Sequence, residues 1–188
     1  MKIINHKISL KNKTIILELL TFQKEDRKIF RDTFKKYQQI NQVITKSLRG
    51  TRRINFPDAL SESIFCLDFN CGKILSAKNA SGYSTSFDCF DPKTNKRIQL
   101  KCSASTGPSS FGPRSEYDDI YFIDMWNNGE INGNYKVYKL NNDDIDNLKV
   151  NKSEKLTDQQ DNKRRPRFDI RLKIIQPLNL QPVFVGKI

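Results

Sequence analysis

The sequence predicts an α/β (α+β) protein that combines helices and strands in one domain. Three observations favour this class: a helical spacing of apolar residues over 24–48, two short extended stretches within 86–103, and a nearly continuous apolar segment at 119–126. A three- or four-residue spacing places apolar side chains on one helical face, whereas an unbroken apolar run is typical of a strand buried on both faces. The length of 188 residues fits a single domain spanning 1–188.

The N-terminal segment contains a basic, partly alternating stretch and then an apolar run at 15–20, so we expect a strand that continues as a helix. The next segment, 24–48, predicts an amphipathic helix, and with it residues 1 to about 50 form an N-terminal helical element. The expected buried face contains Phe30, Phe34, Tyr37, Ile40, Ile44 and Leu48.

A second helix is predicted shortly after residue 50, with Asn55 as its N-terminal cap and Pro57 in its first turn. Glu62 projects from a different side than the apolar face, which contains Leu60, Ile64 and Leu67. Residues 70–85 are rich in Gly, Ser, Asn and Lys, and we interpret them as a loop.

The extended stretches 86–90 and 96–103 predict a hairpin, because the segment between them contains Pro92 and Asn95, which favour a tight reversal. Further strands are expected at 119–126, 135–140 and 148–150. A polar segment at 158–167 precedes an apolar spacing over 168–175 that suggests a short closing helix.

The charge of the chain favours a polyanionic partner. Lys and Arg number 33 against 21 Asp and Glu, which gives a net charge of +12 and a pI near 9.6. Nucleic acid is the leading partner for such a field. A Lys- and Asn-rich composition also arises in an AT-rich genome, so charge alone does not decide the question.

The cysteines lie at 66, 71, 89 and 102 without a CxxC pair, and the chain has one histidine, so zinc-finger spacing is absent. We expect free thiols in a reducing compartment rather than disulfides. No apolar run suggests a membrane span or signal peptide, and we therefore expect a cytoplasmic location.

The candidate chemistry lies on the predicted hairpin. If the hairpin is symmetric about its turn, Asp88 lies opposite Gln99, and Lys101 shares the face of Gln99. A hard divalent cation could be bound here by Asp88, the Gln99 side-chain oxygen and the Leu100 carbonyl. Lys101 is placed to orient or deprotonate a water. Glu62 could complete the metal shell. The alternative is a hairpin with ordinary polar surface residues. A lysine within the apolar strand sequence 98–102 favours the functional interpretation, because burying it without a function would be costly.

Asp88 and the sequence Gln99-Leu100-Lys101, in helix-hairpin-strand order, resemble the signature of the PD-(D/E)XK nuclease superfamily, with Gln99 at a usually acidic position. Three further segments resemble small Type II restriction endonucleases that recognise GCNGC-type sites. These segments are RINFPDALSE at 53–62, SSFGPRS at 109–115 and RRPRF at 164–168. The resemblance covers residues from about 50 to 175.

The resemblance implies a restriction-endonuclease-like mixed β-sheet flanked by helices and a Mg²⁺-dependent, site-specific deoxyribonuclease. It also implies a homodimer in which each subunit cuts one strand of double-stranded DNA, so the element at 1 to about 50 is expected to aid dimerisation or DNA contact. Glu62 lies on a helix that often supplies an auxiliary acid in the superfamily. A cognate DNA methyltransferase is expected as a genetic partner, because the host must protect its own sites.

Base recognition in a GC-rich site requires side chains that reach guanine edges, and arginine is the commonest of these. The candidates are Arg114 and the basic cluster of Lys163, Arg164, Arg165 and Arg167. Arg52 and Arg53 could grip phosphates, and Ser109, Ser110 and Ser115 could contact either bases or phosphates. The alternative for the basic cluster is a solvated charge run at the entry to a helix.

Two other functions remain open. Gln99 and the high charge would also suit a sequence-specific DNA-binding protein that has lost catalysis. A repair or junction nuclease on the same scaffold is the third possibility. Metal-dependent cutting of plasmid DNA, and discrete fragments from it, would distinguish the three.

Overall fold

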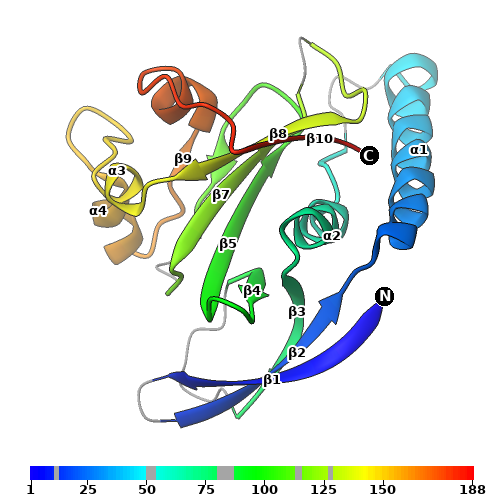
Figure 1. Ribbon diagram of the computed structural model, residues 1–188. Coiled ribbons are helices and arrows are strands. Elements are labelled where there is room, and N and C mark those ends of the chain that lie inside the picture. Colours follow the sequence, from blue (N-terminus) through cyan, green and yellow to red (C-terminus); the bar gives the residue numbers. More distant parts are fainter. Residues whose placement is uncertain (11–12, 50–53, 80–86, 113–115, 127–128) are drawn as a thin grey trace.

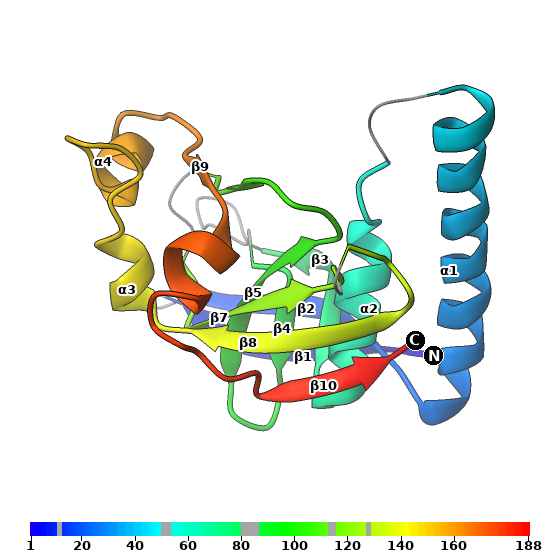
Figure 2. The same cartoon turned by 90° about the horizontal axis from the view of Figure 1, so that it is seen from above.

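The computed structural model describes residues 1–10, 13–49, 54–79, 87–112, 116–126 and 129–188. Its centre is an eight-stranded sheet in the order β1-β2-β3-β4-β5-β7-β8-β10. Strands β5 and β7 pair in parallel and the other neighbours are antiparallel. Helix α2 lies between the sheet and α1, while α3 and α4 lie at the other end of the molecule (Figures 1 and 2). The predicted mixed sheet flanked by helices is confirmed.

The N-terminal segment is a β-hairpin of β1 (Lys2–Leu10) and β2 (Lys13–Thr21). Its apolar run does not become helical, and that prediction is wrong. Ile15, Leu17 and Leu19 are fully buried and alternate with less buried residues, which is the two-residue period of a strand. The N-terminal element is therefore helical only after the hairpin.

The predicted amphipathic helix is confirmed as η1 (Lys24–Asp26), α1 (Arg27–Gln42) and η2 (Val43–Ser47). Phe30, Phe34 and Tyr37 are buried as expected, but Ile40 and Leu48 are 50% and 71% exposed. The face that packs inward continues instead through Asn41, whose side chain donates to the Tyr37 carbonyl and accepts from the Ile54 amide.

Helix α2 (Asp58–Phe69) is confirmed, with Leu60 and Ile64 buried and Leu67 partly buried. Its cap differs from the prediction, because Pro57 occupies the N-cap position and no side chain caps the helix. The helix ends at Asn70, which takes the left-handed conformation with φ 52°.

The segment interpreted as a loop contains strand β3 (Gly72–Lys78), so that prediction is wrong. Its polar and small residues signal a turn locally, but β2 on one side and β4 on the other supply the backbone partners that make it a strand. Residues 80–86 lie outside the described part of the chain.

The predicted hairpin is confirmed as β4 (Cys89–Asp91) and β5 (Lys96–Ser103). The next strands, β7 (Asp119–Asp124) and β8 (Asn134–Leu140), also match their predictions, and β10 (Phe184–Lys187) completes the sheet. The strand expected at 148–150 is only the single bridge between Lys149 and Lys155.

The end of the molecule beyond β8 contains α3 (Asn142–Asp146), α4 (Leu156–Asp161) and η3 (Arg171–Ile175). The helix η3 is a shorter form of the predicted closing helix. A second, two-stranded sheet pairs β6 (Ser109–Ser110) with β9 (Arg167–Phe168). Among the described residues, no helix is both long and apolar enough to cross a membrane.

Candidate active site

Asp88 is fixed between two strands by its own backbone. The Ile74 amide of β3 donates to the Asp88 carbonyl at 3.1 Å, and the Asp88 amide donates to the Ile98 carbonyl of β5 at 3.0 Å. The side chain therefore faces the same surface as Gln99, as the symmetric hairpin predicts. The Gln99 amide Nε2 donates to Asp88 Oδ2 at 2.5 Å, and the Leu100 backbone amide donates to the same oxygen at 2.7 Å.

Lys101 lies two residues further along β5 and joins the same group. Its burial lowers the pKa of the ammonium, while the nearby charges of Asp88 and Asp58 act in the opposite direction. The ammonium nitrogen also lies 5.3 Å from the centre of the Phe111 ring. The structure thus brings Asp88, Gln99 and Lys101 together.

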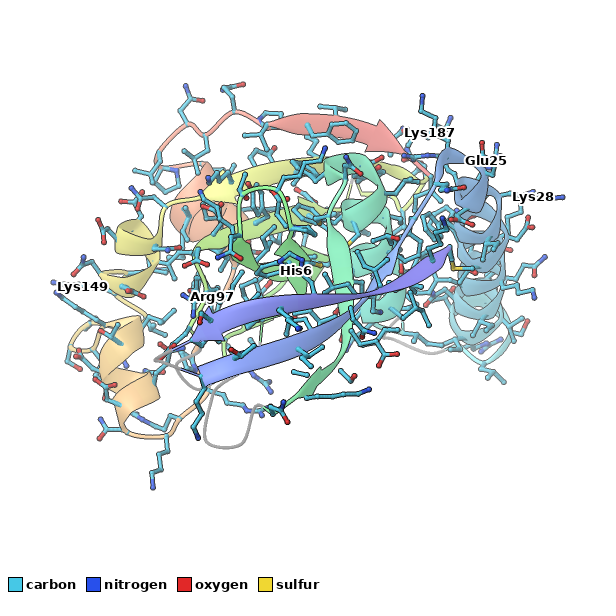
Figure 3. The ribbon with its side chains drawn as sticks, turned by 60° about the horizontal axis from the view of Figure 1, so that its bottom comes forward. His6, Glu25, Lys28, Arg97, Lys149 and Lys187 are labelled. Atoms are coloured by element: carbon cyan, nitrogen blue, oxygen red, sulfur yellow. The ribbon has the colours of Figure 1, made fainter. Side chains whose placement is uncertain are left out.

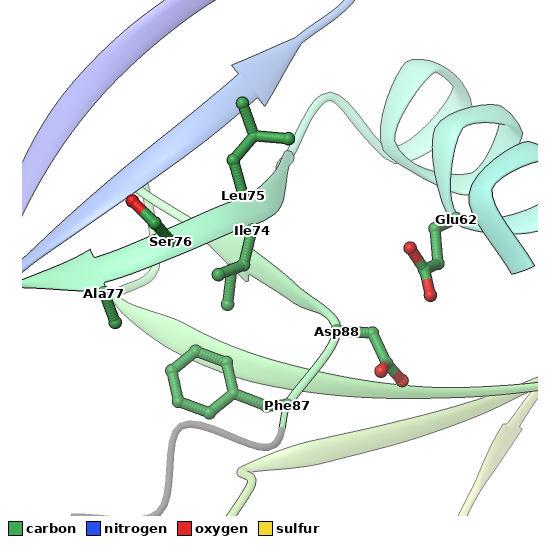
Figure 4. A pocket seen from close by; sticks show the side chains of 7 residues that line it. All are labelled: Glu62, Ile74, Leu75, Ser76, Ala77, Phe87 and Asp88. Carbon is green, nitrogen blue, oxygen red and sulfur yellow. The ribbon is translucent and has the colours of Figure 1, made fainter. Parts of the chain in front are cut away.

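Glu62 approaches the group from α2. Its side chain and that of Asp88 line a hollow of ≈ 330 Å³ that is bounded on its other sides by β3 and Phe87 (Figure 4). Burial raises the pKa of Glu62, although the hydrogen bond from Lys73 opposes this effect. The Lys73 Nζ lies 2.9 Å from Glu62 Oε2, and both side chains are less than one-fifth exposed.

The carboxyl of Asp88 titrates at an unusual pH. Desolvation by burial raises its pKa from 3.8 to about 6, against the lowering effect of the Leu100 amide. Glu62 and Asp58 raise it further, and Lys101 lowers it. A carboxyl whose pKa is raised towards neutral pH in this way is typical of a site that binds a cation or exchanges a proton.

Asp58 and Lys73 belong to this site and were missed by the sequence reasoning. Asp58 lies one helical turn before Glu62 on α2, and its charge acts on Glu62, Asp88 and Lys101. The i, i+4 spacing of the two acids was a signal that could have shown Asp58. The sequence contains no such signal for Lys73, because the segment that contains it is interpreted as a loop.

The donor set fits a hard divalent cation. Asp88 and Glu62 offer carboxylate oxygens at one hollow, and the Gln99 Nε2 that donates to Asp88 also lies 3.4 Å from the Leu100 carbonyl oxygen of β5. Gln99 turns its Nε2 toward Asp88, so its amide must rotate by half a turn to offer the oxygen to the same ion.

The second sheet carries several of the candidate DNA-binding residues. Ser109 pairs with Phe168 and Ser110 with Arg167, so these polar side chains come from two adjacent strands. The Phe111 ring, which lies beneath Lys101, stacks on Phe168 with centroids 4.6 Å apart. This aromatic pair links the second sheet to the candidate active site.

The basic cluster is exposed, as its charge requires. Lys163, Arg164, Arg165 and Arg167 all face solvent. Arg164 forms an ion pair with Glu154, and this pair is the main cause that lowers the pKa of Glu154 to about 2. Arg52, Arg53, Arg114 and Ser115 lie outside the described residues.

The positive charge of the chain is not confined to one patch. Figure 3 shows Lys28 on α1 and Lys149 near α3 projecting outward at opposite ends of the molecule, and Lys187 lies on β10. The net charge therefore attracts polyanions in general, and contacts at the site itself must determine how a polyanion is oriented.

The large mixed sheet flanked by helices, with the partly buried carboxyl of Asp88 hydrogen-bonded to Gln99 of β5, has the architecture of a restriction-endonuclease-like fold. The chain belongs to the Bsp6I restriction endonuclease family, whose model matches residues 22–177. It is similar to the Type II restriction enzyme Bsp6I of Bacillus sp. (strain RFL6), with 30% identity over 176 residues, which cover 89% of this chain and 92% of that enzyme. No solved structure matches the chain significantly.

Proposed function

We propose that this protein is a Type II, site-specific deoxyribonuclease of the PD-(D/E)XK superfamily that requires Mg²⁺. It hydrolyses phosphodiester bonds in both strands of a short, GC-rich, near-palindromic site of the GCNGC type, and it acts as a homodimer in the cytoplasm. The observation that carries this proposal is the convergence of Asp88, Gln99 and Lys101 within a chain of the Bsp6I family. A DNA methyltransferase would protect the host site.

In this function, Asp88, the Leu100 carbonyl, Glu62 and a rotated Gln99 amide would hold the magnesium ion. When bound, Mg²⁺ supplies Lewis-acid stabilisation of the negative charge that gathers on the phosphate oxygens. Lys101 orients an attacking water or accepts a proton from it, and burial favours the neutral amine that the second role needs. Lys73 holds Glu62 at the edge of the hollow.

Recognition of the site is assigned to the second sheet and the basic segments around it. Arg167 and Ser110 face one another on β9 and β6, and the Phe111–Phe168 stack connects them to Lys101. Arg114, Arg164, Arg165 and Lys163 are the further candidates for base or phosphate contacts, with Ser109 and Ser115. Arg52 and Arg53 are candidates for phosphate contacts.

The test is digestion of plasmid DNA of known sequence with the purified chain and Mg²⁺, followed by sequencing of the fragment ends. We expect discrete fragments whose ends fall in one GC-rich site. Asp88→Ala and Lys101→Ala should each abolish cutting while specific binding to the same site survives. Undiminished cutting by Asp88→Ala would refute the assignment.

A DNA-binding protein without catalysis is the second candidate, and Gln99 at a usually acidic position is the observation that favours it. If the protein only binds DNA, the wild-type chain should bind a specific duplex and should not cleave it at any Mg²⁺ concentration. A repair or junction nuclease would instead cut branched DNA and yield no discrete fragments from the intact plasmid.

A further inference from the structure

Three cysteines from three different segments meet in the core beside the candidate active site. Cys66 lies in the last turns of α2, Cys71 lies between α2 and β3, and Cys89 begins β4. Their residues are 1%, 3% and 0% exposed, and all three thiols are free. The expectation of free thiols in place of disulfides is thus confirmed.

The sulfur atoms of these cysteines point at one another. Cys66 Sγ lies 3.2 Å from Cys89 Sγ and 3.5 Å from Cys71 Sγ, and all three atoms lie within 4.8 Å of one another. Free cysteines often pack singly as small apolar side chains, but here three thiols from three segments share one centre. At a metal–sulfur distance of about 2.3 Å, two sulfur ligands of one ion lie at most about 4.6 Å apart, so small shifts of the side chains suffice to enclose an ion.

The backbone builds this convergence. Asn70 in the left-handed conformation turns the chain back at the end of α2, and the Cys71 amide then donates to the Cys66 carbonyl at 3.0 Å. Cys89 arrives opposite Lys73 in the register of β3 and β4. The group is therefore assembled by the helix end and by sheet pairing, rather than by a CxxC motif.

We propose that Cys66, Cys71 and Cys89 form a binding site for one thiophilic metal ion of the Zn²⁺, Cd²⁺ or Cu⁺ class. Within the described part of the chain this group offers only sulfur ligands, which select soft ions and disfavour Mg²⁺. Binding releases the thiol protons, and the positive charge of the ion offsets the negative charge of the thiolates in the buried site.

The ion would crosslink three segments of the chain that adjoin the candidate active site. Cys66 lies one helical turn after Glu62, Cys71 lies two residues before Lys73, and Cys89 directly follows Asp88. Joining the three sulfur atoms would fix α2, β3 and β4 relative to one another and so hold the two carboxylates at the hollow. The site is distinct from the proposed magnesium site and does not depend on it.

The experiment is titration of the reduced, metal-free full-length chain with Cd²⁺ in the presence of excess Mg²⁺. We expect a sulfur-to-cadmium charge-transfer band that saturates at one equivalent per chain, with an increase in Tm, and Zn²⁺ should compete for the same site. Cys71→Ala and Cys89→Ser should lose the band. Circular dichroism is the control that tests whether each variant is folded. Cys102→Ser is the matched control and should retain it.

Asp88→Asn separates this site from the nuclease site, because it should lose cleavage and keep the cadmium band. The proposal is overturned if the wild-type chain gives no band, since that measurement needs no variant to fold. It is also overturned if folded Cys71→Ala keeps the band at full amplitude, or if Asp88→Asn removes it.

Discussion

The side-chain amide of Gln99 on β5 donates a hydrogen bond of 2.5 Å to the carboxylate of Asp88, the residue directly before β4. A neutral donor at this position allows a buried carboxylate to exist without a cation, whereas a second carboxylate would repel it. The same amide weakens the charge that the group offers to a metal. Gln99 therefore balances the stability of the metal-free site against its affinity for a cation.

Gln99→Glu should make the chain more dependent on Mg²⁺. The added carboxylate should lower the Tm of the metal-free protein and reduce the Mg²⁺ concentration for half-maximal cleavage by about tenfold, the equivalent of about 1.4 kcal/mol. Thermal unfolding with and without Mg²⁺, together with a cleavage titration, measures both effects. An unchanged Mg²⁺ requirement would mean that position 99 does not contact the ion.

Asp88→Asn should stabilise the metal-free fold at neutral pH. Because the pKa of Asp88 rises from 3.8 to about 6 on folding, the folded state binds more protons between these values. The contribution of this group is complete below the unfolded pKa and is lost as the pH rises through about 6. Asn mimics the protonated acid, so the variant should be more stable than wild type at pH 8 by the order of 1–3 kcal/mol.

The measurement is urea denaturation of both proteins in EDTA from acidic to mildly alkaline pH. The difference in free energy of unfolding should be small below about pH 4, grow as the pH rises towards the folded pKa of about 6, and become constant above it. The difference between the two proteins cancels the titration of groups that they share. A constant difference across this range would contradict the raised pKa.

Lys73→Met should destabilise the fold, because it leaves the largely buried carboxylate of Glu62 without its ion-pair partner. Loss of one partner of a buried pair costs about 3–5 kcal/mol, and we expect about 1–3 kcal/mol here because both side chains keep some exposure. The same change should raise the pKa of Glu62. Adding Glu62→Gln to Lys73→Met should recover most of the lost stability, and a double-mutant cycle of urea denaturation measures this coupling.

Arg167→Ala and Arg164→Ala should differ in their effect on DNA binding. Arg167 faces Ser110 across the second sheet, whereas Arg164 is held by Glu154. We expect Arg167→Ala to weaken binding to the specific site by about 1–3 kcal/mol if it reads a base, or to reduce the salt dependence by about one charge if it holds a phosphate. Arg164→Ala, the matched control with the same loss of charge, should have the smaller effect. Equal losses of binding affinity in the two variants would contradict the idea that the ion pair with Glu154 keeps Arg164 from contacting DNA.

Much of the fold was determined by local periodicity. The spacing of Phe30, Phe34 and Tyr37 identified α1, and the two extended stretches around residues 91–95 identified the hairpin that carries Asp88 and Gln99. The register of a tight hairpin is set by its turn, which is why the sequence alone predicts that these two residues lie opposite one another.

The sequence by itself determined the hairpin, its facing residues and the positive charge, because each depends on neighbours along the chain. Only the tertiary structure decided that 72–78 is a strand, that Lys73 and Asp58 join the site, and that three cysteines share one centre. These features arise from partners distant in the sequence: a strand rich in small and polar residues is stabilised by the strands beside it, and side-chain convergence depends on how helix and sheet pack.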